Sequence, residues 1–295
     1  MALHPQSRAL LDLLAADDGP SLPDVEAVRA SARAAALAGA DRIGLDHVSD
    51  VDAAGVPCRL YRPRSGAPVA LYVHGGGWVL HDLETHDAFC RYLAHRTGWA
   101  LLAVDYRRAP EHPYPAPLDD VQVAAGWLRA HDREHRVDAS WLPAVGDSSV
   151  ANLIAGLCVR DPRALDFQVL VYPPVDRRVV LSAESNAALT PEGMDWFWDA
   201  YAPGESADHP EVSVAAAGNL ADHPPAYVLT NEHDVLRDQG EAYAAALAEA
   251  GVEVVAHRAL GMVHSFWRQP HLVDAAGATV TMVGALLDAH RSAAR

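Results

Sequence analysis

The sequence has no lysine, so arginine supplies all 23 basic side chains among its 295 residues. This absence excludes several lysine chemistries: a Schiff base, a pyridoxal phosphate anchor, a serine–lysine dyad and a P-loop for phosphate. Acidic residues outnumber the basic ones, with 39 Asp and Glu in total. The excess argues against nucleic acid or an anionic membrane as the main partner and favours a neutral small molecule.

Cysteines and long apolar runs are also few. Cys58, Cys90 and Cys158 are odd in number and form no CxxC pair, so neither a disulfide framework nor a zinc ribbon is predicted. No segment approaches the roughly 18 uninterrupted apolar residues of a membrane span, and the opening MALHPQSRAL lacks a basic region followed by an apolar run. We therefore expect a soluble, cytoplasmic protein with buried or free thiols.

The remaining pattern is typical of an α/β protein. Half of the residues are hydrophobic, which is enough for a sizeable core in one large domain or two small ones. Strands alternate with helices, which predicts a mostly parallel central sheet covered by helices on both faces. The predicted strands are 69–73, 99–104, 142–146, 167–172, 226–230 and 252–258, and the predicted helices are 85–96, 117–131, 149–159, 238–250 and 272–290.

Two segments depart from this alternation. Residues 1–42 have the composition of two alanine- and leucine-rich helices, and two extended runs follow between 45 and 61. Residues 177–220 contain no predicted strand but carry three aromatic residues, Trp196, Phe197 and Trp198. Such an insertion late in a sheet resembles a lid, although ordinary core packing would explain any one of these aromatics equally well.

Three consecutive glycines, Gly75 to Gly77, follow the strand 69–73 in the stretch LYVHGGGWVLHD. A loop of this kind is useful when its backbone N–H groups must face a phosphate or an oxyanion. The missing lysine and the lack of a GxGxxG pattern disfavour the phosphate.

A serine, an acid and a histidine follow three strand ends in the order known from α/β-hydrolases. Ser148 lies in GDSSV directly after strand 142–146, Asp234 just past strand 226–230, and His264 in the loop after strand 252–258. A lone serine at such a junction often only caps a helix. The strength of the prediction therefore comes from the order and from the common position at strand ends, where open α/β sheets bind their ligands.

Several stretches together make the chain resemble the hormone-sensitive-lipase-like carboxylesterases of the α/β-hydrolase superfamily. They are HGGGW, DYRRAPEHPYPAPLDD, GDSSVAN, YPPVD, DVLRDQG and GMVHSF. The resemblance implies an α/β-hydrolase core of residues 43–176 and 221–295, with residues 1–42 and the insertion 177–220 forming a helical cap. It implies neither a cofactor nor a metal.

The resemblance also implies the roles of the site residues. Ser148 is expected to be the nucleophile, His264 the general base and acid, and Asp234 the partner that orients the histidine. The backbone N–H groups expected to form the oxyanion hole are those of Gly76, Gly77 and Ser149. The candidates for the wall of the substrate pocket are Trp78, Trp196 and Phe266, with packing as the alternative.

Neighbouring residues compete for some of these roles. Ser149 as the nucleophile would put Asp147 at the elbow position that Gly146 fits. Glu232 and Asp238 are alternatives to Asp234 as the acid. Each is explained equally well as a solvated carboxylate at the start of a helix. The remaining histidines show no HExxH spacing, so we expect none of them to bind a metal.

The elbow departs from the family pattern GDSAGG because Val150 stands two positions after the nucleophile. A β-branched side chain there should crowd the adjacent strand or residue 146. Either the neighbours are small enough to accommodate it or the serine is displaced. Ser265, where a glycine is usual, is a milder departure.

The sequence thus predicts a serine hydrolase that cleaves neutral esters with short or medium acyl chains through an acyl-enzyme. An amidase or formamidase with the same triad is one alternative. A non-catalytic small-molecule-binding protein, as in the gibberellin receptors that resemble this family but lack the histidine, is another. A homodimer is a family-level expectation.

Overall fold

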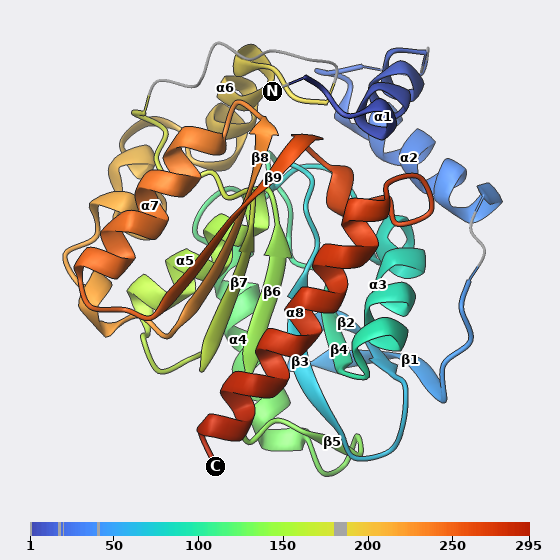
Figure 1. The fold of residues 1–295 in the computed structure, drawn as a ribbon, viewed down its shortest axis with the longest axis vertical. Coiled ribbons are helices and arrows are strands. Elements are labelled where there is room, and N and C mark those ends of the chain that lie inside the picture. Colours follow the sequence, from blue (N-terminus) through green and yellow to red (C-terminus); the bar gives the residue numbers. More distant parts are fainter. Residues whose placement is uncertain (1, 17–18, 20, 40–41, 180–187) are drawn as a thin grey trace.

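The structure is a computed structural model that describes residues 2–16, 19, 21–39, 42–179 and 188–295 (Figure 1). The strands are β1 His47–Ala53, β2 Val56–Arg62, β3 Ala67–Val73, β4 Ala100–Val104, β5 Val137–Asp138, β6 Pro143–Asp147, β7 Phe167–Val171, β8 Ala226–His233 and β9 Val254–Val263. The α-helices are α1 Pro5–Ala15, α2 Val25–Gly39, α3 Leu83–Thr97, α4 Ala116–His131, α5 Ser149–Arg160, α6 Pro191–Tyr201, α7 Arg237–Glu249 and α8 Asp274–Ala293. Short 3-10 helices are η1 Gly204–Asp208, η2 Val214–Ala216, η3 Leu220–Asp222 and η4 Phe266–Arg268.

The strands form one twisted sheet with the order β1-β2-β4-β3-β6-β7-β8-β9, and β5 pairs with β3. β1 and β2 are antiparallel to their neighbours, whereas the strands from β4 to β9 run parallel. The carboxyl ends of β3, β6, β8 and β9 therefore meet at one edge, the upper edge in Figure 1. The predicted α/β-hydrolase fold with a mostly parallel sheet is confirmed.

Helices cover both faces of the sheet, as the alternation of strands and helices predicted. Residues of α4, α5 and α7 pack on one face in one hydrophobic cluster. Residues of α3 and α8 pack on the other face in a second cluster. No helix in the described part of the chain is long and apolar enough to cross a bilayer, and all three cysteines are buried and unpaired.

Two strands run further than predicted, β8 to His233 instead of residue 230 and β9 to Val263 instead of residue 258. The sequence suggested a strand at 252–258 followed by a loop, but β9 continues to Val263, directly before His264. After a register shift between Asn231 and His233, His233 pairs with Val263. The extension holds His264 at the end of a paired strand instead of in a free loop.

Of the segments expected to form a cap, α6 lies above the carboxyl edge of the sheet, whereas the chain near η3 reaches the far end of α5, where Asn219 donates to the oxygen of Val159 (Figure 1). Between β7 and β8 the described residues form α6 and the short helices η1 to η3. α1 and α2 lie near the same edge in Figure 1. The division into cap and core stays a prediction.

Charged contacts hold α2 to the rest of the molecule, because none of its residues is buried. Arg29 donates to the backbone oxygens of Val79 and Ala109, 2.8 Å away in each case. Arg33 pairs with Asp82, which also caps α3 by accepting a 2.9 Å hydrogen bond from the N–H of Thr85.

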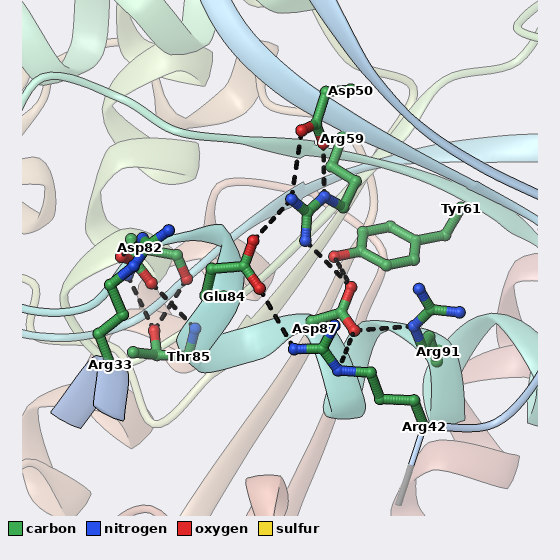
Figure 2. A network of polar contacts seen from close by, with 10 residues as sticks. All are labelled: Arg33, Arg42, Asp50, Arg59, Tyr61, Asp82, Glu84, Thr85, Asp87 and Arg91. Carbon is green, nitrogen blue, oxygen red and sulfur yellow. Dashed lines mark hydrogen bonds and ion pairs between the residues drawn. The ribbon is translucent and has the colours of Figure 1, made fainter. Parts of the chain in front are cut away.

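A larger network centres on Asp87 of α3 and is drawn in Figure 2. The Asp87 side chain is fully buried and accepts a 3.0 Å hydrogen bond from the hydroxyl of Tyr61. Three guanidinium groups surround it, those of Arg91 at 2.8 Å and of Arg59 and Arg42 at 3.2 Å. The network joins β2, α3 and the chain after α2 through one carboxylate.

Burial alone would raise the pKa of Asp87, but the hydrogen bonds from Arg91 and Tyr61 and the charges of Arg91 and Arg42 outweigh it, so this pKa lies below its usual value. The ionised Asp87 therefore stabilises the folded state fully above the pKa of an unfolded aspartate, about 3.9. This stabilisation is lost as the pH falls through the lower pKa that Asp87 has in the folded state.

Replacing Asp87 by asparagine should lower the free energy of unfolding by roughly 3 kcal/mol at neutral pH, because three arginines lose the fully buried carboxylate that they share. Urea unfolding at neutral and acid pH measures this, and the difference from wild type should shrink below about pH 4. The matched control is Asp50→Asn, which removes a partner of Arg59 that is 70% exposed and should cost less than about 1 kcal/mol. Equal losses in the two variants would contradict the prediction.

Candidate active site

Ser148 lies in a sharp turn between β6 and α5. Its φ is 61° and its ψ −135°, and its N–H donates to the oxygen of Val171 over 2.8 Å. A positive φ is strained for a residue with a side chain, and such strain is often kept where it exposes a reactive group. The serine is therefore presented at the carboxyl edge of the sheet, as the sequence predicted.

Val150 fits beneath this turn because residue 146 is glycine. A Cβ at Gly146 would lie 2.8 Å from Cδ1 of Ile154 and 3.1 Å from Cγ2 of Val150. Val150 is fully buried in the cluster of α4, α5 and α7, and it is absent from the described residues that line the cavity at Ser148. Of the two outcomes expected for this valine, accommodation by a small neighbour is the one observed.

The predicted triad residues are in hydrogen-bonding contact. Nε2 of His264 is 2.9 Å from Oγ of Ser148, and Nδ1 of His264 is 2.8 Å from Oδ2 of Asp234. An ionised carboxylate only accepts, so Nδ1 carries a proton and Nε2 is left to accept from the serine hydroxyl. The arrangement can transfer the serine proton to the imidazole.

The competing acids are engaged elsewhere. Glu232 accepts a 2.7 Å hydrogen bond from the N–H of Gly261, and Asp238 pairs with the neighbouring Arg237 at 2.7 Å. Asp234 alone of the three makes a described contact with His264.

Asn231 completes the acid side of the site and was not foreseen from the sequence. Its Nδ2 donates to Oδ2 of Asp234 over 2.9 Å and to the oxygen of Val263 over 3.1 Å. It thereby fixes both the carboxylate and the residue before His264. The only sequence signal was its position three residues before Asp234, inside a strand where an amide needs a partner when buried.

The glycine loop approaches Ser148 closely. A Cβ on Gly77 would lie 2.1 Å from Phe197, and one on Gly76 would lie 2.6 Å from the oxygen of Leu80. Both glycines also have positive φ, 130° for Gly76 and 63° for Gly77. Only glycine therefore fits either position.

Three backbone N–H groups near Ser148 remain available. Within the described residues, those of Gly76, Gly77 and Ser149 find no hydrogen-bond acceptor. Oγ of Ser149 accepts a 3.0 Å hydrogen bond from the N–H of Trp78, which ties the glycine loop to the start of α5. The arrangement leaves donors beside the nucleophile for a negatively charged oxygen.

A cavity of about 260 Å³ opens above the serine. Gly76, Gly77, Ser148 and His264 line its base. Its apolar wall comes from α1 and α6, and the residues are Leu10, Leu14, Met194 and Phe197. Helices from two distant parts of the sequence thus cover one site.

The three aromatics predicted for the pocket wall lie elsewhere. Trp78 is buried and stacks on Tyr201 with 4.5 Å between the ring centroids, and Phe266 is buried behind Tyr172. Trp196 is half-buried beside Phe197. Only Phe197 among the residues of that aromatic run lines the cavity.

The reason is the rotation of α6, which buries Met194, Trp198 and Tyr201 on one face. These positions follow the helical spacing of three and four, and Phe197 belongs to the same face. Trp196 points out of it. That spacing was readable in the sequence and would have favoured Phe197 over Trp196.

Neutral histidines surround the glycine loop. Burial lowers the pKa of His74 to about 4, and it also holds the pKa values of His81 and His86 well below their usual range. Nδ1 of His74 is 3.1 Å from the oxygen of Gly75, a contact that shapes the loop. Among the described residues, no group of three or more acidic, histidine or cysteine side chains could hold a metal ion.

Backbone strain is concentrated around the cavity. Seven described non-glycine residues have positive φ, and five of them adjoin the site: Trp78, His81, Ser148, Tyr172 and Ser265. Each costs on the order of 1 kcal/mol or more, so the surrounding packing must hold them in place.

Known proteins share this architecture. A family model described as the alpha/beta hydrolase fold matches residues 70–268. The chain belongs to this family. An ethyl acetate hydrolase of Pseudomonas putida is 34% identical, and the match covers 98% of this chain and 100% of that protein. The esterase LipI of Mycobacterium tuberculosis is 36% identical over 79% of this chain and 77% of its own.

Solved structures agree with the sequence relatives. A hyperthermophilic esterase from the archaeon Pyrobaculum calidifontis superposes with a TM-score of 0.89 and is 35% identical, covering 100% of this chain and 99% of that one. The resemblance of this hydrolase to the hormone-sensitive-lipase-like carboxylesterases is therefore confirmed.

Replacing Val150 by alanine should lower the stability of this hydrolase by about 1.5 to 3 kcal/mol, because it empties buried space under the elbow. Turnover of a short ester should stay within about threefold of wild type, since the valine does not line the cavity. Thermal unfolding and initial rates measure the two effects. Val159→Ala, a half-buried position on the same helix, is the control for stability. A rate loss above about a hundredfold in folded protein would show that Val150 shapes the site.

Replacing Asn231 by alanine should lower kcat about ten- to a hundredfold with little change in KM, because a hydrogen bond to the charged Asp234 is lost. The control is Asn219→Ala, which removes a 2.9 Å bond to the oxygen of Val159 away from the site. Steady-state kinetics of both variants check the prediction. A change confined to KM, or an equal effect in the control, would refute a positioning role.

Proposed function

We propose that the protein is a serine carboxylesterase acting on neutral esters with short to medium acyl chains. The observation that carries the proposal is the contact of Ser148 with His264, at 2.9 Å, beside three N–H groups with no acceptor among the described residues. Its relatives are named esterase, carboxylesterase and ethyl acetate hydrolase.

In the first half of the reaction, Oγ of Ser148 attacks the ester carbonyl while Nε2 of His264 accepts its proton. The N–H groups of Gly76, Gly77 and Ser149 stabilise the negative oxygen of the tetrahedral intermediate, each by roughly 3 to 4 kcal/mol. His264 then donates the proton to the leaving alkoxide, and the acyl group stays on Ser148.

In the second half, a water molecule attacks the acyl-enzyme. His264 again takes the proton and returns it to Oγ of Ser148 as the carboxylic acid leaves. Asp234 stabilises the imidazolium in both halves. No step requires a cofactor.

The cavity supports the preference for neutral, modest substrates. Its apolar wall of Leu10, Leu14, Met194 and Phe197 suits an alkyl chain, and its volume of about 260 Å³ is small. We assign α1, α2 and α6 to a cap that closes over the substrate. The non-catalytic alternative loses its support because His264 is present and in contact with Ser148.

Replacing Ser148 by alanine should lower kcat by at least about a thousandfold in folded protein, because no other group attacks the carbonyl. Initial rates on p-nitrophenyl esters from acetyl to dodecanoyl, with one anilide for comparison, measure this. Labelling with a p-nitrophenyl alkylphosphonate should modify Ser148 in the wild type, as located by peptide mass spectrometry. Retained turnover in the variant, or label on Ser149, would contradict the assignment, and an anilide cleaved as fast as the esters would favour an amidase.

A further inference from the structure

A second and larger cavity lies beside the catalytic one. It has a volume of about 700 Å³ and lies between α2, α3 and the chain that follows His264. Its wall is part apolar and part polar: Ala35, Ala36, Gly39, Ala88 and Phe89 form the apolar part, and Glu84, Thr85, His86, Arg268, Gln269 and His271 form the polar part. Arg268 and Gln269 line both cavities, so they stand at the boundary between the two.

Two histidines adjoin Arg268 at this boundary, and we call His81, His86 and Arg268 together the partition. The rings of His81 and His86 meet edge to face with 5.2 Å between their centroids. Nη1 of Arg268 lies 3.1 Å from Nε2 of His86, and its Nε lies 3.4 Å from Oδ2 of Asp147. His81 and Arg268 line the catalytic cavity, and His86 and Arg268 line the second.

The hydrogen bonds define the protonation of His86. Oγ1 of Thr85 donates to the oxygen of Asp82 over 2.8 Å, so it must accept from Nδ1 of His86, 3.1 Å away. Nε2 of His86 is then unprotonated and accepts from the permanently charged guanidinium of Arg268. A hydrogen bond to a neutral ring and the contact of its Nε with Oδ2 of Asp147 therefore hold the arginine across the boundary, and a side-chain rotation that breaks both releases it.

The chemistry of the triad indicates which part of a substrate lies toward the partition. The leaving oxygen must come within hydrogen-bond reach of Nε2 of His264, because that nitrogen supplies its proton. Arg268 follows His264 by four residues through η4, so the partition lies on the histidine side of the cavity. The acyl chain then faces the wall formed by α6, because α1 packs on β9 beside His264, where the N–H of His4 donates to the oxygen of Gly261 over 3.1 Å.

We propose that the second cavity is the subsite for the alcohol part of the ester, specifically the alkyl chain of a primary alcohol, and that Arg268 restricts entry to it. The inference rests on the proposed esterase function. The catalytic cavity, at about 260 Å³, is smaller than the roughly 300 to 1,000 Å³ typical of ligand pockets, whereas the second cavity lies within that range. Short alcohols fit in front of the partition, and long ones need the space behind it.

The test compares alkyl acetates from ethyl to octyl, with acid release followed in a pH-stat. Arg268→Ala should raise the ratio of kcat/KM for octyl acetate to that for ethyl acetate at least about tenfold, because several methylene groups gain an apolar site. The same ratio for p-nitrophenyl octanoate and acetate should stay within about twofold of wild type, because the acyl side is untouched. A shift in the acyl series alone would overturn the assignment, as would no shift in either.

Filling the second cavity shows whether the gain arises there. Adding Ala36→Trp to Arg268→Ala should cancel the gain for octyl acetate, since Ala36 is half-buried in that wall and far from the triad in sequence. A gain that survives the tryptophan would overturn the proposal. The matched control is Arg129→Ala, which should leave the alcohol series unchanged. Arg129 is partly buried and pairs with Asp166 at 2.7 Å. This pair lies near the start of β6, and Ser148 follows the other end of that strand.

A binding measurement separates this inference from the esterase proposal. Calorimetric titration of 1-octanol into the Ser148→Ala protein requires no turnover. Adding Arg268→Ala should tighten octanol binding about fivefold or more, and adding Ala36→Trp should reverse the change. If the wild type hydrolyses no ester but octanol binds in this way, the esterase proposal fails and the subsite stands. If neither substitution changes the affinity for octanol, the subsite is refuted even when the protein is an active esterase.

Discussion

The turn at Ser148 is the constraint on which the rest of the site depends. β6 is paired on both sides, with β3 and β7, and α5 begins one residue after the serine. The chain must therefore reverse at a single residue, which takes the positive φ of Ser148 and leaves no room for a Cβ at Gly146. The same turn brings the first N–H of α5 beside Oγ, so the nucleophile and one oxyanion donor are produced by one backbone geometry.

Arginine replaces apolar burial as the link between α2 and the core. The guanidinium of Arg29 bridges the oxygen of Val79, in the loop that follows the glycines, and the oxygen of Ala109, in the segment after β4. A planar fork with several donors can do this, whereas the single ammonium of a lysine cannot hold two oxygens in fixed directions. The absence of lysine is thus consistent with a chain that uses its cations as structural crosslinks, with Asp87 as the most buried junction.

The sequence predicted those parts of the site whose positions follow from the ends of strands. Ser148, Asp234 and His264 follow three strands of one parallel sheet, and such ends necessarily converge. Phe197 at the cavity was not predicted, although the spacing of Met194, Trp198 and Tyr201 along the helix would have favoured it over Trp196. Asn231 was missed because a polar residue in a strand gives no sign of its partner, which here includes Val263 from a strand 32 positions away.

Charge balance around His264 links the partition to the chemistry. The imidazolium formed during the reaction is opposed by any nearby cation and favoured by Asp234. His74, His81 and His86 add no positive charge, since burial keeps their pKa values low. Among the described residues that line the cavity, Arg268 is the permanently charged cation, and Oδ2 of Asp147 lies 3.4 Å from its Nε. Together, Arg268 and Asp147 carry a net charge close to zero. An arginine can therefore lie near the catalytic histidine and limit the size of the site without suppressing the proton transfer to that histidine.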